Sequence, residues 1–126
     1  MVSPSRDYLA HLHMPILNLL LCEKQFIIAD LLVSIGAHLY DQNRDEEALE
    51  CFNKAIEIDS NHYEAWFNKG FLLLQLGNYK EAAECFNKAI EIYPNELFAW
   101  YYKEAALSYL NKKEEAVECL KEARKK

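Results

Sequence analysis

A nine-residue sequence occurs twice in this chain, and the two copies lie 34 residues apart. Residues 50–58 (ECFNKAIEI) recur letter for letter at 84–92. Over the whole period, residues 29–62 match residues 63–96 at 14 of 34 positions, and a weaker copy starts at residue 97. Chance does not produce three copies in phase, so we expect a tandem array of similar structural units.

Each copy has the pattern of two antiparallel helices. In the second copy, apolar and small residues recur at helical spacing on both sides of Gly77. The equivalent positions in the other copies are Asn43 and Asn111. Since Gly and Asn tolerate the left-handed conformation just past a helix end, all three copies predict a turn there. The expected helices lie near residues 29–42, 45–58, 63–76, 79–92, 97–110 and 113–124.

The composition favours a helical fold and restricts the class of partner. The 126 residues include only 3 Gly and 3 Pro and no Thr, which argues against a β-sandwich or barrel. The formal net charge is −6, so the excess of Lys and Arg that marks nucleic-acid binders is missing. The most apolar stretch, residues 16–40, is interrupted by charged residues and lacks the small residues of a signal cleavage site. We therefore expect a cytoplasmic protein with no nucleic-acid partner and no membrane partner.

Sequence motifs for catalysis are missing from the chain. It contains no phosphate-binding loop, no dinucleotide-binding fingerprint, no nucleophile elbow and no H-E-x-x-H zinc motif. His11 and His13 are the pair that could chelate a metal, and we expect that they do not. Cys51, Cys85 and Cys119 hold equivalent positions, about 10 Å apart in a stack of repeats, which is too far for a disulfide. Each is predicted to be a small buried hydrophobic residue, and we expect no enzyme activity, no metal and no cofactor.

The second copy has small, aromatic and proline residues at set positions of the 34-residue period: Trp66, Gly70, Ala82, Phe86, Ala89 and Pro94. In this pattern it resembles the tetratricopeptide repeat (TPR). The first copy has Leu32 in place of the Trp, and the third has Glu104 and Leu120 in place of the Gly and the second aromatic residue. The resemblance implies an all-α, right-handed superhelical solenoid of antiparallel helix pairs. The expected domains are an extra apolar N-terminal helical segment, 1–28, and three repeats, 29–62, 63–96 and 97–126.

The resemblance also implies a function, because the first helices of such repeats form a concave groove that binds peptides. Family members that hold acidic C-terminal tails use Lys, Arg and Asn in the groove, and only Asn68 fits that set here. The aromatic groove residues instead predict an apolar or aromatic-containing peptide or helix as partner, and hence a non-catalytic protein–protein interaction module. The predicted groove residues are Val33, Ser34, Ala37, Glu64, Phe67, Asn68, Phe71, Phe98, Tyr101 and Tyr102.

The two ends of the chain suggest a second possibility, a self-associating homodimer scaffold with no separate peptide client. No turn residue separates the N-terminal segment from the first copy, so residues from about Pro15 to Gln42 form either one long helix or two short ones. A helix that is apolar on most of its circumference has to be covered, by folding back over the first helix pair or by a second copy of the chain. The last repeat also lacks a polar capping helix. The residues predicted for self-association are Ile16, Leu17, Leu19, Leu20, Phe26, Ile27, Val117 and Leu120.

Overall fold

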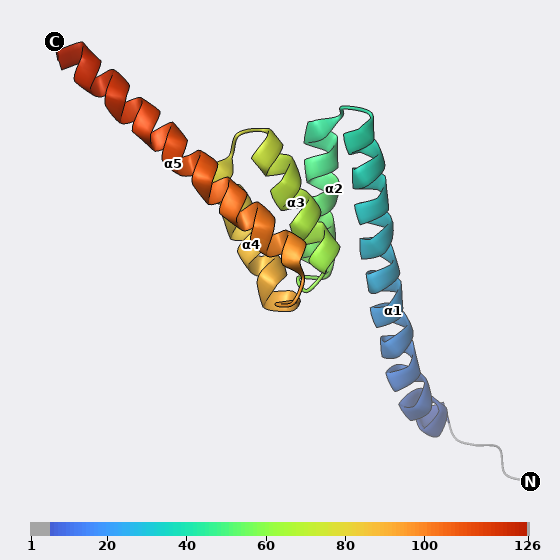
Figure 1. Cartoon of the computed structure of the whole chain (residues 1–126). Coiled ribbons are helices and arrows are strands. Elements are labelled where there is room, and N and C mark those ends of the chain that lie inside the picture. Colours follow the sequence, from blue (N-terminus) through green and yellow to red (C-terminus); the bar gives the residue numbers. More distant parts are fainter. Residues whose placement is uncertain (1–5, 126) are drawn as a thin grey trace, which may run out of the picture.

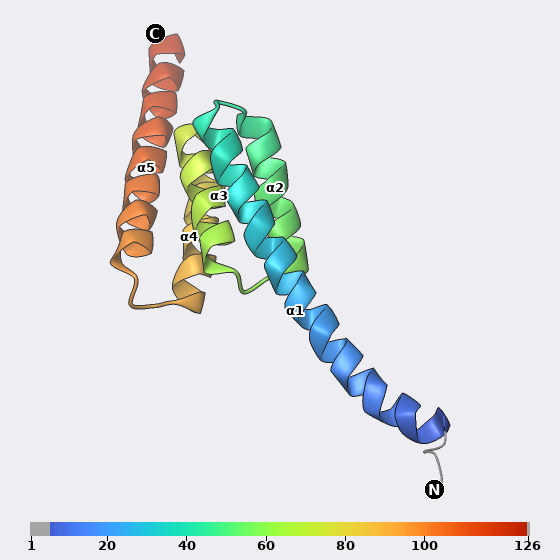
Figure 2. The ribbon, with the colours of Figure 1, turned by 90° about the vertical axis from the view of Figure 1, so that its right-hand side faces the viewer.

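The computed structural model describes residues 6–125, with side chains from residue 15 onward, and this part of the chain is built from five α-helices. Consecutive helices run antiparallel, and α1 and α5 extend in different directions beyond the middle of the molecule (Figure 1). Figure 2 shows α3 and α4 between α1 and α2 on one side and α5 on the other. Because α3 contacts both α1 and α5, the first helices of the three copies lie side by side. The helices are α1 (Arg6–Asp41), α2 (Asp45–Ile58), α3 (Tyr63–Gln75), α4 (Tyr79–Ile92) and α5 (Leu97–Lys125).

Glycine allows the two helices of the first and second copies to approach closely. A Cβ atom on Gly36 would lie 2.6 Å from Cε1 of Phe52, and one on Gly70 would lie 3.0 Å from Cε1 of Phe86. These two rings are 2% and 0% exposed. Each ring therefore fills the space over a glycine, and its burial stabilises the fold by about 2–3 kcal/mol. The surrounding alanines are fully buried as well: Ala48, Ala55, Ala82 and Ala89.

The predicted turns at Asn43 and Gly77 are confirmed. Both residues adopt positive φ angles, 62° and 86°. In each turn the N–H of the following residue donates to the carbonyl oxygen five positions earlier over 2.9 Å, which satisfies a free carbonyl at the helix end. The boundaries of α2, α3 and α4 agree with the expected helices to within one residue.

The third copy does not form a helix pair. The expected helices 97–110 and 113–124 are one continuous helix, α5, so the predicted turn at Asn111 is wrong. The buried residues of α5 are Ala99 and Ala106, which both precede that position. All the described residues from 111 onward are exposed.

Glu104 gives a physical reason for this difference. It occupies the position that Gly36 and Gly70 hold in the other copies, where even a Cβ atom would meet a buried ring. A glutamate side chain keeps a second helix from approaching, and burying its carboxylate without a partner costs several kcal/mol. The residues that follow Asn111 are Lys and Glu, which are good helix formers, so the helix continues.

The N-terminal segment and the first helix of the first copy form one helix, which decides between the two arrangements that the sequence leaves open. This helix, α1, begins at Arg6, so Pro15 lies inside it and not at its start. All residues from 15 to 28 are exposed, and Ala29 is the first buried residue. The segment therefore does not fold back over the first helix pair (Figure 1). No helix in the described part of the chain is long and apolar enough to cross a membrane.

Candidate functional site

A cavity of about 410 Å³, called the groove cavity below, opens where α1, α3 and α5 lie side by side. Six of the ten predicted groove residues line it: Ala37, Phe67, Asn68, Phe71, Phe98 and Tyr102. The structure therefore brings together residues from all three copies. The remaining lining residues are Tyr40, Asp41 and Phe52.

The other four predicted groove residues lie outside the groove cavity. Val33 is buried in the core between α1 and α2, so it is not available to a ligand. Ser34 is exposed on α1, and Glu64 lines a separate, smaller cavity. Tyr101 is 67% exposed and packs edge-on against Tyr102, with 5.2 Å between the ring centroids.

Of the three remaining lining residues, Tyr40 lies at a position that the TPR resemblance implies for the groove, whereas Asp41 and Phe52 do not. Asp41 is the last residue of α1 and lies one position past that pattern. Phe52 belongs to a second helix, and its ring reaches the first helix because Gly36 has no side chain. The glycine in the repeat pattern is therefore the signal that could have revealed Phe52.

Aromatic rings form a continuous network along the groove cavity. Phe71 packs edge-to-face against Tyr102 on α5 and against Tyr40 on α1, with centroid separations of 5.3 and 6.2 Å. Phe67 contacts Tyr102 at 5.7 Å in the same geometry. The Tyr40 hydroxyl also donates a hydrogen bond to Oε1 of Gln75 on α3. These contacts fix the rings before any ligand binds, since edge-to-face pairs are favourable in themselves.

Acidic residues accompany the aromatic ones on this face. Asp41 is the one charged residue that lines the groove cavity in the described part of the chain. A neighbouring cavity of about 240 Å³ is lined by Asp30 and Glu64, among others. Asp30 Oδ1 lies 2.6 Å from Nε2 of His62, and Nδ1 of the same ring accepts a hydrogen bond from the backbone N–H of Ala65. Neither cavity is lined by Lys or Arg in this part of the chain.

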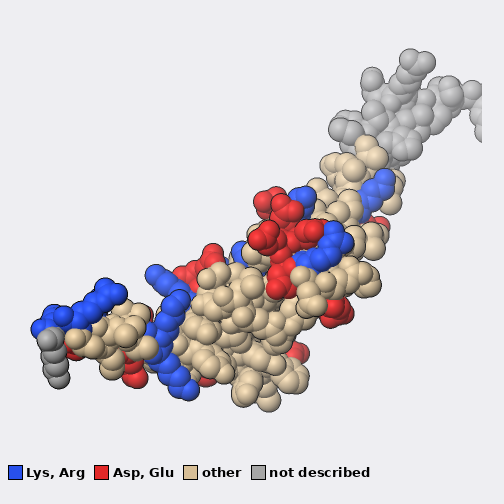
Figure 3. Space-filling model, turned by 90° about the horizontal axis from the view of Figure 1, so that it is seen from above, with Lys and Arg blue, Asp and Glu red and all other residues tan. Residues whose placement is uncertain are grey.

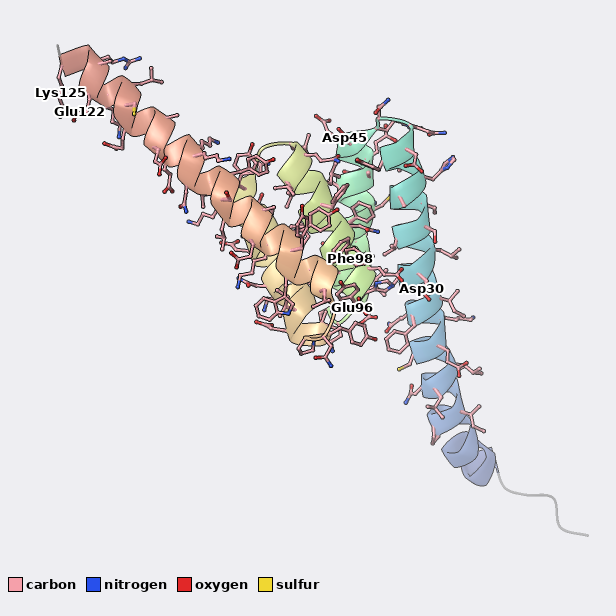
Figure 4. The ribbon with its side chains drawn as sticks, in the orientation of Figure 1. Asp30, Asp45, Glu96, Phe98, Glu122 and Lys125 are labelled. Carbon is pink, nitrogen blue, oxygen red and sulfur yellow. The ribbon has the colours of Figure 1, made fainter. Side chains whose placement is uncertain are left out.

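Glu96 adds a further negative charge at the start of α5. Burial, and after it the charge of Glu96, raise the pKa of the Tyr63 hydroxyl above its ordinary value. Tyr63 lines the same cavity as Asp30, so the charge of Glu96 acts in that cavity. Figure 4 shows Asp30 on α1 and, on the same side of the molecule, Glu96 and Phe98 near the start of α5.

Two family models match the central part of the chain. Residues 63–96 match the model described as tetratricopeptide repeat, and residues 36–77 match one described as TPR repeat. Residues 36–96 are therefore tetratricopeptide repeats. Residues 97–126, in which Glu104 replaces the glycine, lie outside both matches.

Solved TPR structures resemble the fold. The second TPR of Spaghetti (RPAP3), bound to an HSP90 peptide, superposes with a TM-score of 0.67 at 23% identity and covers 79% of this chain and 94% of that chain. The first TPR of the same protein, bound to the same peptide, gives 0.65 at 25% identity and covers 71% of each chain. MamA (41-end) from Desulfovibrio magneticus RS-1 gives 0.63 at 28% identity, over 75% of this chain and 53% of that one.

One curated relative shares part of the sequence. The uncharacterized protein MJ0572 of Methanocaldococcus jannaschii is 44% identical over 45 residues, which are 36% of this chain. The match spans 52% of that protein, so this chain covers about half the length of the relative. The relative's name carries no statement of function, so it supports the sequence family alone.

The cysteines at equivalent TPR positions have different surroundings. Cys85 is buried, and this burial raises the pKa of its thiol to about 11. Cys51 is half-buried, while Cys119 is exposed because it lies on the free part of α5. The prediction of a buried residue is therefore wrong for Cys119.

His11 and His13 precede the residues whose side chains are described, and from residue 15 to 125 no group of three or more His, Cys, Asp or Glu could hold a metal.

The residues predicted for self-association are all exposed, but they form two separate groups. The first group lies on α1 between residues 16 and 27 and includes Leu19 at 66% exposure. The second consists of Val117 and Leu120 near the end of α5, with Leu120 65% exposed. The two helices extend away from each other, so one chain does not bring these groups together (Figure 1).

Proposed function

We propose that this TPR protein is a protein–protein interaction module whose groove cavity binds an apolar or aromatic-containing peptide or helix. The observation that carries the proposal is a preformed cavity with aromatic side chains from α1, α3 and α5 around one opening. The two Spaghetti TPR domains with the same fold have a peptide bound, the HSP90 peptide SRMEEVD. Their likeness supports a peptide as the ligand class.

The exposure of the α5 residues supports an apolar ligand. Phe98 lines the groove cavity and is 68% exposed, and Tyr101 beside it is exposed to a similar extent. Covering each of these rings stabilises a complex by about 1–2 kcal/mol. Phe67 and Phe71 are half-buried and already fixed by their neighbours, so binding does not have to order them.

The charge of the groove argues against the peptide class that the Spaghetti domains bind. The sequence SRMEEVD carries three carboxylate side chains and a terminal carboxylate. The groove cavity offers them Asn68 and no Lys or Arg, while Asp41 repels them. An acidic tail is therefore a poor ligand for this chain.

Substitution of the exposed rings tests the proposal. Phe98→Ser and Tyr101→Ser should abolish selection of apolar peptides from a displayed random library, and they should leave the circular dichroism spectrum and melting temperature unchanged. The matched control is Leu97→Ser, because Leu97 is 78% exposed, precedes Phe98 directly and does not line the cavity. Unchanged selection by the two variants, or an equal loss in the control, would contradict a groove that binds through these rings.

A homodimer scaffold is the second candidate function, and one observation favours it. Residues 16–28 of α1 include eight large apolar side chains that are about half exposed and lie on most of the helix circumference. Covering eight such side chains provides on the order of 6–12 kcal/mol, which is comparable to the cost of association. Leu20 and Ile27 lie two turns apart on one side of the helix, so Leu20→Glu with Ile27→Glu should give a monomer in sedimentation. Gln25→Glu is the control, because Gln25 is exposed on the opposite side of the same helix. A wild-type monomer at high concentration would contradict this candidate.

A further inference from the structure

We propose that the ligand of the groove combines apolar side chains with an arginine, and that the guanidinium pairs with Asp41 while it lies against the aromatic rings of the cavity. This inference rests on the proposed function and adds the charge of the partner to it. It follows from the position of one unpaired carboxylate among aromatic residues and from the charge of the surrounding face.

Asp41 has the position and the freedom that such a pair requires. It lines the groove cavity, and its side chain is exposed. The nearest Lys or Arg along the chain, Arg44, already pairs with Glu47, and His38 in the last turn of α1 contacts the side chain of Gln42. Within the described residues Asp41 makes no ion pair. It also ends α1, where the helix dipole contributes additional negative charge.

The aromatic neighbours favour a guanidinium over other polar groups. A cation over the face of an aromatic ring gains about 0.5–1 kcal/mol at an exposed site. Tyr40 precedes Asp41 in the sequence, and its ring packs on Phe71. A planar guanidinium can lie flat on a ring and still donate two hydrogen bonds to one carboxylate, which an ammonium cannot do. Arginine is therefore expected to bind better than lysine.

The rest of the face has the same sign of charge. Asp30 and Glu64 line the separate cavity of about 240 Å³, where Asp30 contacts His62, and the charge of Glu96 acts on Tyr63 in the same cavity. Figure 4 shows Asp30 and Glu96 on the side of the molecule that also carries Phe98. Together these carboxylates attract a positively charged segment and repel an acidic one before contact. The net charge of −6 acts in the same direction.

A set of three labelled peptides tests the inference by fluorescence anisotropy. In the probe, phenylalanine and leucine alternate with arginine, and in the two matched peptides glutamine or glutamate replaces each arginine. The arginine peptide should bind about three- to tenfold more tightly than the glutamine peptide and more tightly still than the glutamate peptide. Raising the ionic strength from about 0.05 M to about 0.3 M should reduce this preference, since the pair is exposed.

Asp41→Asn should reduce the preference for the arginine peptide to about twofold or less, while binding of the glutamine peptide stays unchanged. Glu50→Gln is the matched control, because Glu50 is exposed on α2, lines none of the cavities described and changes the net charge equally. Equal binding of all three peptides, or an equal effect of both variants, would overturn the inference but leave the groove proposal intact. If no peptide binds, both the inference and the groove proposal are overturned. The same holds if a second copy of the chain occupies the groove, which a doubled mass in solution would reveal.

Discussion

Glu104 prevents the third copy from forming a helix pair, and its replacement should allow that pair to form. The variant Glu104→Gly, Asn111→Gly and Leu120→Phe gives the third copy the residues that the second copy has at Gly70, Gly77 and Phe86. We expect α5 to break at position 111 and its last part to pack antiparallel to residues 97–110, as α4 packs on α3.

The structure gives the size of the opposing effects. Closure would cover Val117 and the ring at position 120, and would contribute about 3–5 kcal/mol of apolar burial. Breaking α5 removes a few backbone hydrogen bonds, each worth about 1 kcal/mol, and the glycine turn recovers about two of them. The balance favours closure by a few kcal/mol. With Glu104 present, closure would bury an unpaired carboxylate at a cost of several kcal/mol, and closure becomes unfavourable.

Small-angle scattering and hydrogen exchange measure the change. In the open form, the residues after 111 extend about 20 Å as a free helix, so closure should shorten the longest dimension by a similar amount. Amides from 116 to 123 should exchange quickly in the wild type and slowly in the variant. Glu104→Gln with the same two other substitutions is the control, since it removes the charge but keeps the volume. If this control closes as readily as the glycine variant, the steric part of the reasoning is wrong. If the glycine variant stays extended, both the steric and the electrostatic parts of the reasoning are wrong.

Three further predictions follow from individual residues. Gly70→Ala should lower the free energy of unfolding by about 1–3 kcal/mol in urea denaturation, because the new Cβ lies 3.0 Å from Phe86 and 3.2 Å from Cβ of Cys85. Gly77→Ala should cost about 1 kcal/mol through its φ of 86°, and Gly77→Asn should cost less, as Asn43 holds a similar angle. The free energy of unfolding should fall between about pH 9 and pH 11, because burial raises the pKa of Cys85 from 9.0 to about 11 and the unfolded chain ionises first. Cys85→Ala should remove this part of the pH dependence, and a wild-type curve that is flat in this range would contradict it.

The repeat pattern predicts the middle of the molecule well because local and tertiary preferences agree there. Gly77 and Asn43 end helices by their own conformational freedom, and Gly70 with Phe86 fixes how the helices close. At Asn111 the local preference for a turn is weak, and without a pair of helices to close, the helix simply continues. Asn111 by itself indicates a turn, whereas Glu104, at the position of Gly36 and Gly70, indicates that no second helix packs there.

The groove was predicted in part for a related reason. The family pattern assigns positions on first helices, and six of the ten predicted residues do line the cavity. It cannot assign Asp41, which lies past the last patterned position, nor Phe52, which reaches the groove from a second helix. The pattern also does not separate groove residues from core residues, and Val33 is buried in a core cluster with residues of α2 and α3. Charge and exposure at such positions depend on the neighbouring helix and have to be taken from the structure.

The open third copy leaves the groove cavity complete, because α5 lines it with Phe98 and Tyr102, which both precede Asn111. The part of α5 that faces the groove is held by Ala99 and Ala106, which are buried, and by the contacts of Tyr102 with Phe67 and Phe71. None of these contacts involves the residues after 111. The glycine variant that closes the third helix pair should therefore change the shape of the molecule without changing the affinity for the arginine peptide. A large change in that affinity would mean that the free end of α5 takes part in binding, which the position of the groove cavity argues against. Figure 3 shows this end of the chain projecting away from the body of the molecule, with basic and acidic side chains interspersed along it.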